Sequence, residues 1–242
     1  MKLSGKGLIL FMVVAVLMGS CFDPPEYSNT PVISYVKTVY KDASNPSLND
    51  SLIVSVTFKD GNGDLGLNDP DTLDPYNNKY YFRFLDNSLI TYKTRRTNPN
   101  YDTLPAFIKP YYCLNWEIRK INGKIDTVYF QLNPNYYNWF IKFYVQDPIT
   151  AEYNELNFQT DFVTGPNSCG ISSNGRFPIL SRTGKSVPIE GTINWGFPSP
   201  LFELIIGSRK FKVKVTIQDR SLNRSNTVES EPLLLNQIRI RV

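Results

Sequence analysis

The sequence contains no histidine, and this absence removes whole classes of function. A chain of 242 residues without histidine has no Ser-His-Asp or Cys-His catalytic group and no histidine-ligated zinc or haem site. Glycosidases need only two carboxylates, about 5–9.5 Å apart, but Glu117, Glu152, Glu155 and Glu190 are isolated in the sequence. Each is expected at a solvated position on a strand or loop. The sequence therefore predicts a protein that is not an enzyme.

The apolar run Leu8–Met18 is too short to cross a bilayer. It holds 11 residues, whereas the hydrocarbon core requires about 20. It follows the two basic residues Lys2 and Lys6 and precedes the small residues Gly19 and Ser20. This order of charge, apolar run and small residues is typical of a secretory signal. Residues 1–20 are therefore predicted to be a signal peptide.

The segment Leu17-Met18-Gly19-Ser20-Cys21 resembles a bacterial lipobox, with Met18 at the position that leucine usually takes. The resemblance implies cleavage before Cys21 and a diacylglycerol thioether on its sulfur, which would anchor the protein to a membrane. The alternative is an ordinary signal peptide whose cleavage site happens to precede a cysteine. Residues 21–31 are polar and proline-rich after the cysteine, which predicts a tether.

The mature chain is almost neutral and has few cysteines. Without residues 1–20 it keeps 24 basic and 22 acidic side chains, and this balance gives no sign of the basic face that a nucleic-acid partner needs. Besides Cys21 it has only Cys113 and Cys169. In an oxidising envelope compartment these two can form a disulfide. The alternative is two separate buried thiols.

Alternating apolar and polar residues predict strands. Leu52, Val54, Val56 and Phe58 form one apolar series, and Phe211, Val213, Val215 and Ile217 form another; this period of two indicates strands with one dry face. Further strands are predicted at Val32–Lys41, Tyr80–Leu85, Leu89–Thr94, Tyr112–Ile121, Asp126–Leu132, Trp139–Gln146, Val187–Asn194 and Gln237–Val242.

The turn signals favour an antiparallel fold. Asn122-Gly123 is typical of a type I′ hairpin turn, and Pro200–Ile206 is the one segment that suggests a short helix or turn. Many strands separated by Gly, Pro and Asn predict an all-β, antiparallel immunoglobulin- or fibronectin-like β-sandwich. We expect one domain over residues 32–242 with an elaborated middle insertion. The loop-like stretch 164–186 leaves open a split into two domains.

Residues 60–71 (DGNGDLGLNDPD) are rich in oxygen ligands separated by glycines. Calcium takes 6–8 oxygens, and glycines permit the tight backbone that a short ligating loop needs. An EF-hand is not predicted, because its sixth position is Leu65 and its twelfth is not glutamate. A calcium site at one end of a sandwich fits better. Its expected ligands are Asp60, Asn62, Asp64, Asp69, Asp71 and Asp219. The alternative is a turn held by Asx hydrogen bonds that binds nothing.

The segment Lys210–Ser230 resembles the last hairpin of bacterial immunoglobulin-like and fibronectin-like domains. In that topology the strands Leu52–Lys59 and Lys210–Gln218 run in the same direction. Their exit loops, residues 60–71 and 219–226, would then lie at the same end of the sandwich. This expectation rests on analogy at the level of the fold.

Three stretches together resemble a group of Bacteroidota outer-membrane lipoproteins. These are Asp60–Leu67 (DGNGDLGL), Pro188–Ile193 (PIEGTI) and Asp219–Asn226 (DRSLNRSN). That group has similar DGDGDLG and DRxxNxSN stretches after a lipobox, while residues 72–180 add little to the likeness. The resemblance implies a lipid-anchored β-sandwich and no established activity. Some lipoproteins of that phylum reach the cell surface through an acidic export signal directly after the cysteine. Here only Asp23 and Glu26 are acidic in that segment. A periplasm-facing and a surface-exposed protein therefore both remain open.

Two functions follow from these features. The first is a non-enzymatic interaction or scaffold module of the cell envelope, with a protein of the envelope as partner and loops at one end making the contacts. The alternative is a surface glycan-binding lipoprotein, because the aromatic clusters Tyr76–Tyr81, Tyr111–Trp116 and Tyr136–Phe140 could stack on sugars. Aromatic side chains in strands are more often part of the core, so outward-facing rings would favour glycan binding and inward-facing rings would oppose it.

Overall fold

The chain consists mainly of β-strands. A computed structural model describes residues 25–43, 50–83, 88–108, 113–159, 161, 170, 172–181, 186–198 and 202–241. The predicted signal peptide, the predicted lipidation site Cys21 and Cys169 lie outside the described residues. No helix among the described residues is both long enough and apolar enough to span a membrane.

The strands are β1 (Val32–Asp42), β2 (Ser51–Asp60), β3 (Lys79–Tyr81), β4 (Trp116–Ile121), β5 (Lys124–Leu132), β6 (Trp139–Gln146), β7 (Tyr153–Leu156), β8 (Ile189–Pro198), β9 (Phe211–Ile217), β10 (Val228–Glu229) and β11 (Arg239–Arg241). The helical segments are α2 (Tyr92–Thr97), α3 (Phe202–Ile206) and the 3-10 turns η1 (Pro99–Tyr101) and η2 (Leu235–Gln237).

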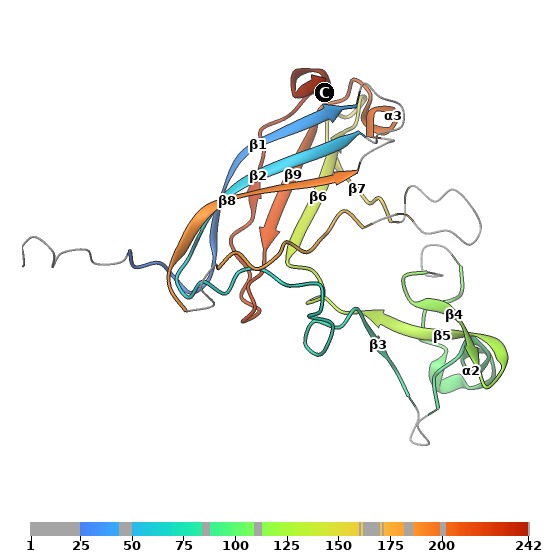
Figure 1. The fold of residues 1–242 in the computed structure, drawn as a ribbon. Coiled ribbons are helices and arrows are strands. Elements are labelled where there is room, and N and C mark those ends of the chain that lie inside the picture. Colours follow the sequence, from blue (N-terminus) through green and yellow to red (C-terminus); the bar gives the residue numbers. More distant parts are fainter. Residues whose placement is uncertain are drawn as a thin grey trace, which may run out of the picture.

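Two four-stranded sheets form the main body. One has the strand order β11-β1-β2-β8 and the other β10-β9-β6-β7, and a third sheet has the order β3-β5-β4 (Figure 1). Neighbouring strands are antiparallel except β1 and β11, which are parallel. The all-β, largely antiparallel character that the sequence predicts is therefore confirmed.

The core lies between the two larger sheets, and it is filled by the apolar side chains that the sequence places at every second position. The side chains of Phe211, Val213, Val215 and Ile217 on β9 are fully buried, while the intervening residues are partly exposed. They belong to one apolar cluster with Leu52, Val54 and Val56 of β2 and with β6. Because each strand contributes every second side chain, the two sheets share one continuous core.

An aromatic group closes one end of this core. Phe143 of β6 contacts the rings of Phe158, Phe197 and Phe202, with centroid separations of 5.4–5.5 Å. Phe202 begins α3, the short helix predicted from Pro200–Ile206, and stacks on Phe158. The helix therefore contributes an apolar side chain to the core even though it has only five residues.

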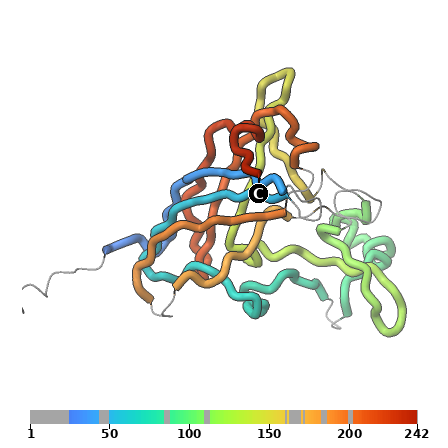
Figure 2. Tube along the Cα trace, turned by 45° about the horizontal axis from the view of Figure 1, so that its top comes forward, coloured from blue at the N-terminus to red at the C-terminus, as the bar shows by residue number. Residues whose placement is uncertain are grey.

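The third sheet belongs to a separate small unit in the middle of the chain. It is inserted between β2 and β6 and lies to one side of the larger sheets in both views (Figures 1 and 2). Ile90, Trp116 and Tyr129 form its own small apolar cluster. Strands from both sides of residues 164–186 pair within the same sheets, β2 with β8 and β6 with β9, so the sandwich is continuous across that stretch.

The sequence-based strand boundaries need three corrections in this unit, and the first is that the strand expected at Tyr80–Leu85 ends at Tyr81. The strand expected at Leu89–Thr94 is wrong, because Tyr92–Thr97 forms α2 with Thr91 as its N-cap, whose side chain accepts a hydrogen bond from the Thr94 N–H. Such a cap favours a helix over a strand. The strand expected from Tyr112 begins only at Trp116. The hairpin turn at Asn122-Gly123 is confirmed, with φ of 48° and 83°.

Candidate functional site

The acidic loop lies where strands from the two sheets end side by side. Asp60 is the last residue of β2, and Asp219 follows β9 by two residues. Leu65 and Asp219 form an isolated antiparallel bridge, and the Arg220 N–H donates to the carbonyl of Asp64 at 3.1 Å. The loops after β2 and β9 therefore meet at one end of the sandwich, as the analogy with immunoglobulin-like topology led us to expect.

Three of the predicted ligands converge there. One carboxylate oxygen from each of Asp60, Asp64 and Asp219 lies within 4.8 Å of the others. Asp60 is 0% exposed, Asp219 is 2% exposed and Asp64 is partly buried. Three acidic side chains are thus gathered at a site almost closed to solvent.

Hydrogen bonds from the loops fix these carboxylates. Asp60 Oδ2 accepts from the Asp64 N–H at 3.0 Å, and Asp219 Oδ1 accepts from the Asn223 N–H at 2.7 Å. Each strand-end aspartate therefore closes its own loop four residues further on. Asp64 Oδ2 accepts from both the N–H and the hydroxyl of Ser221, at 3.1 and 2.6 Å. This carboxylate joins the two loops to each other.

Three oxygens at this end have no such partner. The Oδ1 atoms of Asp60, Asn62 and Asp64 are buried and accept no hydrogen bond. In the part of the chain that the structure describes, no lysine or arginine forms an ion pair with Asp60, Asp64 or Asp219. Buried polar atoms almost always find a partner, so these oxygens need an explanation.

Burial and mutual repulsion act on the charge of the site. Burial, followed by the negative charges of Asp64 and Asp219, raises the pKa of Asp60 to about 6. Burial also raises the pKa of Asp219, against the opposing hydrogen bonds from Asn223. The protein alone therefore does not fully compensate the negative charge held there.

Two of the predicted ligands, Asp69 and Asp71, lie outside this cluster. Asp69 is exposed. Asp71 pairs with Arg220 at 2.8 Å and accepts from the Asn68 N–H, which together lower its pKa, the Asn68 hydrogen bond being the largest cause. An arginine contact leaves this carboxylate already compensated. Sequence reasoning missed Ser221, which contacts Asp64 across the two loops; its only signal was its place two residues after Asp219.

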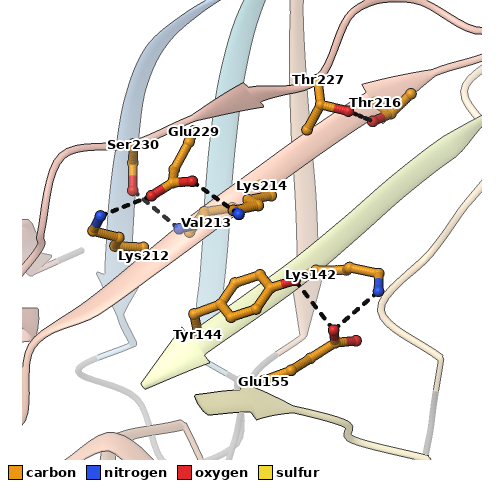
Figure 3. Close-up of polar contacts among 10 residues, drawn as sticks. All are labelled: Lys142, Tyr144, Glu155, Lys212, Val213, Lys214, Thr216, Thr227, Glu229 and Ser230. Carbon is orange, nitrogen blue, oxygen red and sulfur yellow. Dashed lines mark hydrogen bonds and ion pairs between the residues drawn. The ribbon is translucent and has the colours of Figure 1, made fainter. Parts of the chain in front are cut away.

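A second feature is the solvent-facing side of the β10-β9-β6-β7 sheet. Figure 3 shows Glu229 between Lys212 and Lys214, and Glu155 accepting hydrogen bonds from Lys142 and Tyr144. The ammonium group of Lys214 also lies 4.7 Å from the centre of the Tyr144 ring. Lysines, glutamates and an aromatic ring thus form an ordered polar lattice on this face.

A hollow of about 370 Å³ opens on the same face. Its charged lining residues are Lys142, Lys214, Arg224 and Glu155. The Arg224 guanidinium lies 4.4 Å from the centre of the Phe140 ring, and it donates hydrogen bonds to the neutral oxygens of Gln218 and Pro134. The hollow therefore has a positive excess, and its arginine is not neutralised by any described carboxylate.

The tryptophans of the aromatic clusters are buried, and one of the two predicted disulfide cysteines lies among the described residues. Trp116 is 1% exposed and Trp139 is 0% exposed, so both tryptophans of the predicted sugar-stacking clusters face the interior. Tyr80 is 37% exposed, whereas Tyr76 turns inward to donate to the Arg220 carbonyl. Cys113 is disulfide-bonded, and its pairing with Cys169 stays a prediction because that residue lies outside the described ranges.

Three of the four glutamates considered for catalysis are on separate strands, and Glu152 lies directly before β7. Glu117 of β4 is held by Lys79 and Tyr81, and Glu155 of β7 by Lys142. Glu190 of β8 accepts from the Tyr27 hydroxyl at 2.7 Å.

No family model, curated protein or solved structure matches the chain.

Proposed function

We propose that the protein is a non-enzymatic, lipid-anchored interaction module of the outer membrane. The order of basic residues, apolar run and Gly-Ser-Cys at residues 1–21 supports export and lipid attachment. The resemblance to Bacteroidota lipoproteins points in the same direction. The body of the module would serve as a rigid scaffold that presents a binding face at a fixed distance from the lipid.

We also propose that the scaffold is an immunoglobulin- or fibronectin-like sandwich. Its strand orders correspond to that topology if β1, β2 and β8 take places A, B and E, and β7, β6, β9 and β10 take places C′, C, F and G. The β3-β5-β4 unit would then be an insertion between B and C. β11, added beside β1, would be an extra edge strand.

The hollow on the outer sheet face carries the functional proposal. Its three cationic side chains outnumber its single carboxylate, and complementary charge directs which partners approach such a surface. We therefore assign it an acidic segment of another envelope protein as partner. The glycan-binding alternative is less well supported, because the tryptophans expected to stack on sugars are in the cores.

The lipid anchor is tested in a bacterial host fed with labelled palmitate. The full chain should incorporate the label and sediment with the outer membrane. Cys21→Ser should lose all incorporation, because serine has no thiol for the thioether. Cys113→Ser serves as the control and should keep the label. Labelling that survives Cys21→Ser would contradict the anchor.

The binding face is tested by site-specific photocrosslinking in cells that express the full chain. A crosslinker replacing Thr216, which lines the hollow, should yield one defined adduct. The same group replacing Leu204, 82% exposed on α3, should not. Arg224→Glu should weaken the adduct about tenfold or more, equivalent to a loss of about 1.4 kcal/mol of binding free energy.

Lys37→Glu is the matched control for this experiment. Lys37 is exposed on β1, in the other sheet, so the same reversal of charge should leave the adduct unchanged. Equal losses in the two variants would show a general effect of net charge. That result, or equal adducts from positions 216 and 204, would refute the assigned face.

A further inference from the structure

We propose that Asp60, Asp64 and Asp219 bind a calcium ion that joins the two loops at this end of the sandwich, with Asn62 as a further oxygen ligand. The inference goes beyond the proposed binding module, because it concerns a metal site and does not depend on any partner. It rests on the convergence of carboxylates and on the buried oxygens left without hydrogen bonds.

Hydrogen bonds within and between the loops account for four of the six carboxylate oxygens of the site. Asx-type bonds account for Asp60 Oδ2 and for both oxygens of Asp219. They leave the Oδ1 of Asp60 unpartnered on a residue that is 0% exposed. A turn built only for its own closure would not bury a charged oxygen without a donor, since that is costly.

The neutral ligand strengthens the argument. Asn62 Oδ1 is also buried and accepts no hydrogen bond, although an amide oxygen carries no net charge and readily finds a donor elsewhere. Carboxylate and amide oxygens that accept no hydrogen bond are typical ligands of a cation. The cation would supply the positive charge that no described lysine or arginine provides.

The chemistry and spacing of the donors indicate the ion. All the donors are oxygens, which select hard cations over zinc or copper. Ligands on opposite sides of one calcium ion are separated by up to about 5.2 Å, because each lies about 2.3–2.6 Å from the metal. The three carboxylates, within 4.8 Å of one another, satisfy that limit. Backbone carbonyls and waters would complete a calcium shell of 6–8 oxygens more readily than the strict octahedron of magnesium.

The position of the site defines what the ion would do. Asp60 comes from β2 in one sheet and Asp219 follows β9 in the other, so the ion would join the two sheets of the sandwich. The Gly61 N–H also donates to the Ser28 carbonyl in the tether at 2.8 Å. Calcium would therefore hold together the end of the sandwich that the tether enters.

The test is a thermal melt of the full chain in detergent micelles, in EGTA and then with free CaCl₂ or MgCl₂. With calcium at about one hundred times its dissociation constant, the melting midpoint should rise by about 5–10 °C, because the ion binds only the folded state. Isothermal titration should give one calcium per chain. Magnesium should produce a clearly smaller rise.

The variants separate ligand loss from misfolding. Asp60→Asn keeps the shape of the side chain and removes one of the repelling charges. This variant should melt at the same or a higher temperature in EGTA, yet lose most of its response to calcium. Asp219→Asn should lose the response as well, and Asp69→Asn, in the same loop but outside the cluster, should keep the wild-type shift.

Three results would overturn the site. The first is a wild-type chain that melts at one temperature with EGTA and with calcium and shows no calcium binding by titration. The second is an unchanged shift in both Asp60→Asn and Asp219→Asn. The third, an equal response to magnesium, would overturn the assignment to calcium.

Discussion

Phe143→Ala is expected to lower the free energy of unfolding by about 3–5 kcal/mol, the usual loss for a buried phenylalanine. Phe143 is fully buried, and its ring contacts three other phenylalanine rings from separate segments of the chain. Because those rings are anchored on β8, on α3 and after β7, they cannot easily collapse into the space. A domain of ordinary stability, about 5–15 kcal/mol, would lose a large part of it.

Urea unfolding followed by tryptophan fluorescence measures this loss, since Trp139 begins the same strand. Ile149→Ala is the control, because Ile149 is 92% exposed and its truncation should stay within about 0.5 kcal/mol of the wild type. If Phe143→Ala cost no more than Ile149→Ala, the aromatic group would not be part of the core.

The large sheets were predictable because their strands carry a clear two-residue period. The side chains of β9 alternate without exception between buried and partly exposed positions, and the register between β6 and β9 is regular over seven pairs. Trp139–Gln146 was predicted with its observed boundaries for the same reason. Burial of one strand face requires an apolar residue at every second position, and this pattern can be recognised wherever a strand is long enough.

The inserted unit was harder to predict because little of it is periodic. β3 has only three residues, and α2 depends on a local cap at Thr91 rather than on an apolar stripe, as none of its residues is buried. The order of strands within the sheets also depends on pairings between distant segments, such as β1 with β11. A single sequence has no local signal for such contacts.

The acidic site was predictable in composition but not in geometry. The sequence identified Asp60, Asn62 and Asp64, and the fold analogy placed Asp219 beside them. It had no means of separating Asp71, which Arg220 neutralises, from the three carboxylates that converge. Leu65, which ruled out an EF-hand, has a structural role of its own, because it is 0% exposed and anchors the loop in the core.

Gly66→Ala is expected to destabilise the protein by about 3 kcal/mol or more, through backbone strain and two lost hydrogen bonds. Gly66 has a φ of +107°, and a Cβ there would lie 2.2 Å from the Pro178 carbonyl oxygen. Two hydrogen bonds flank this position, from the Leu67 N–H to the Phe177 carbonyl and from the Leu180 N–H to the Leu65 carbonyl. Both would have to break for residues 65–67 to move away from residues 177–180.

Gly123→Ala provides the comparison, because Gly123 also has a positive φ, +83°, but nothing lies within 4 Å of its Cβ position. It should cost only about 1–2 kcal/mol, the strain of the left-handed conformation alone. The difference in urea midpoint between the two variants isolates the close approach. Since Leu65 bridges Asp219, displacement of this backbone should also reduce the response to calcium in Gly66→Ala, whereas Gly123→Ala should keep it. Equal stabilities in the two variants would mean that the acidic loop is not packed against residues 177–180.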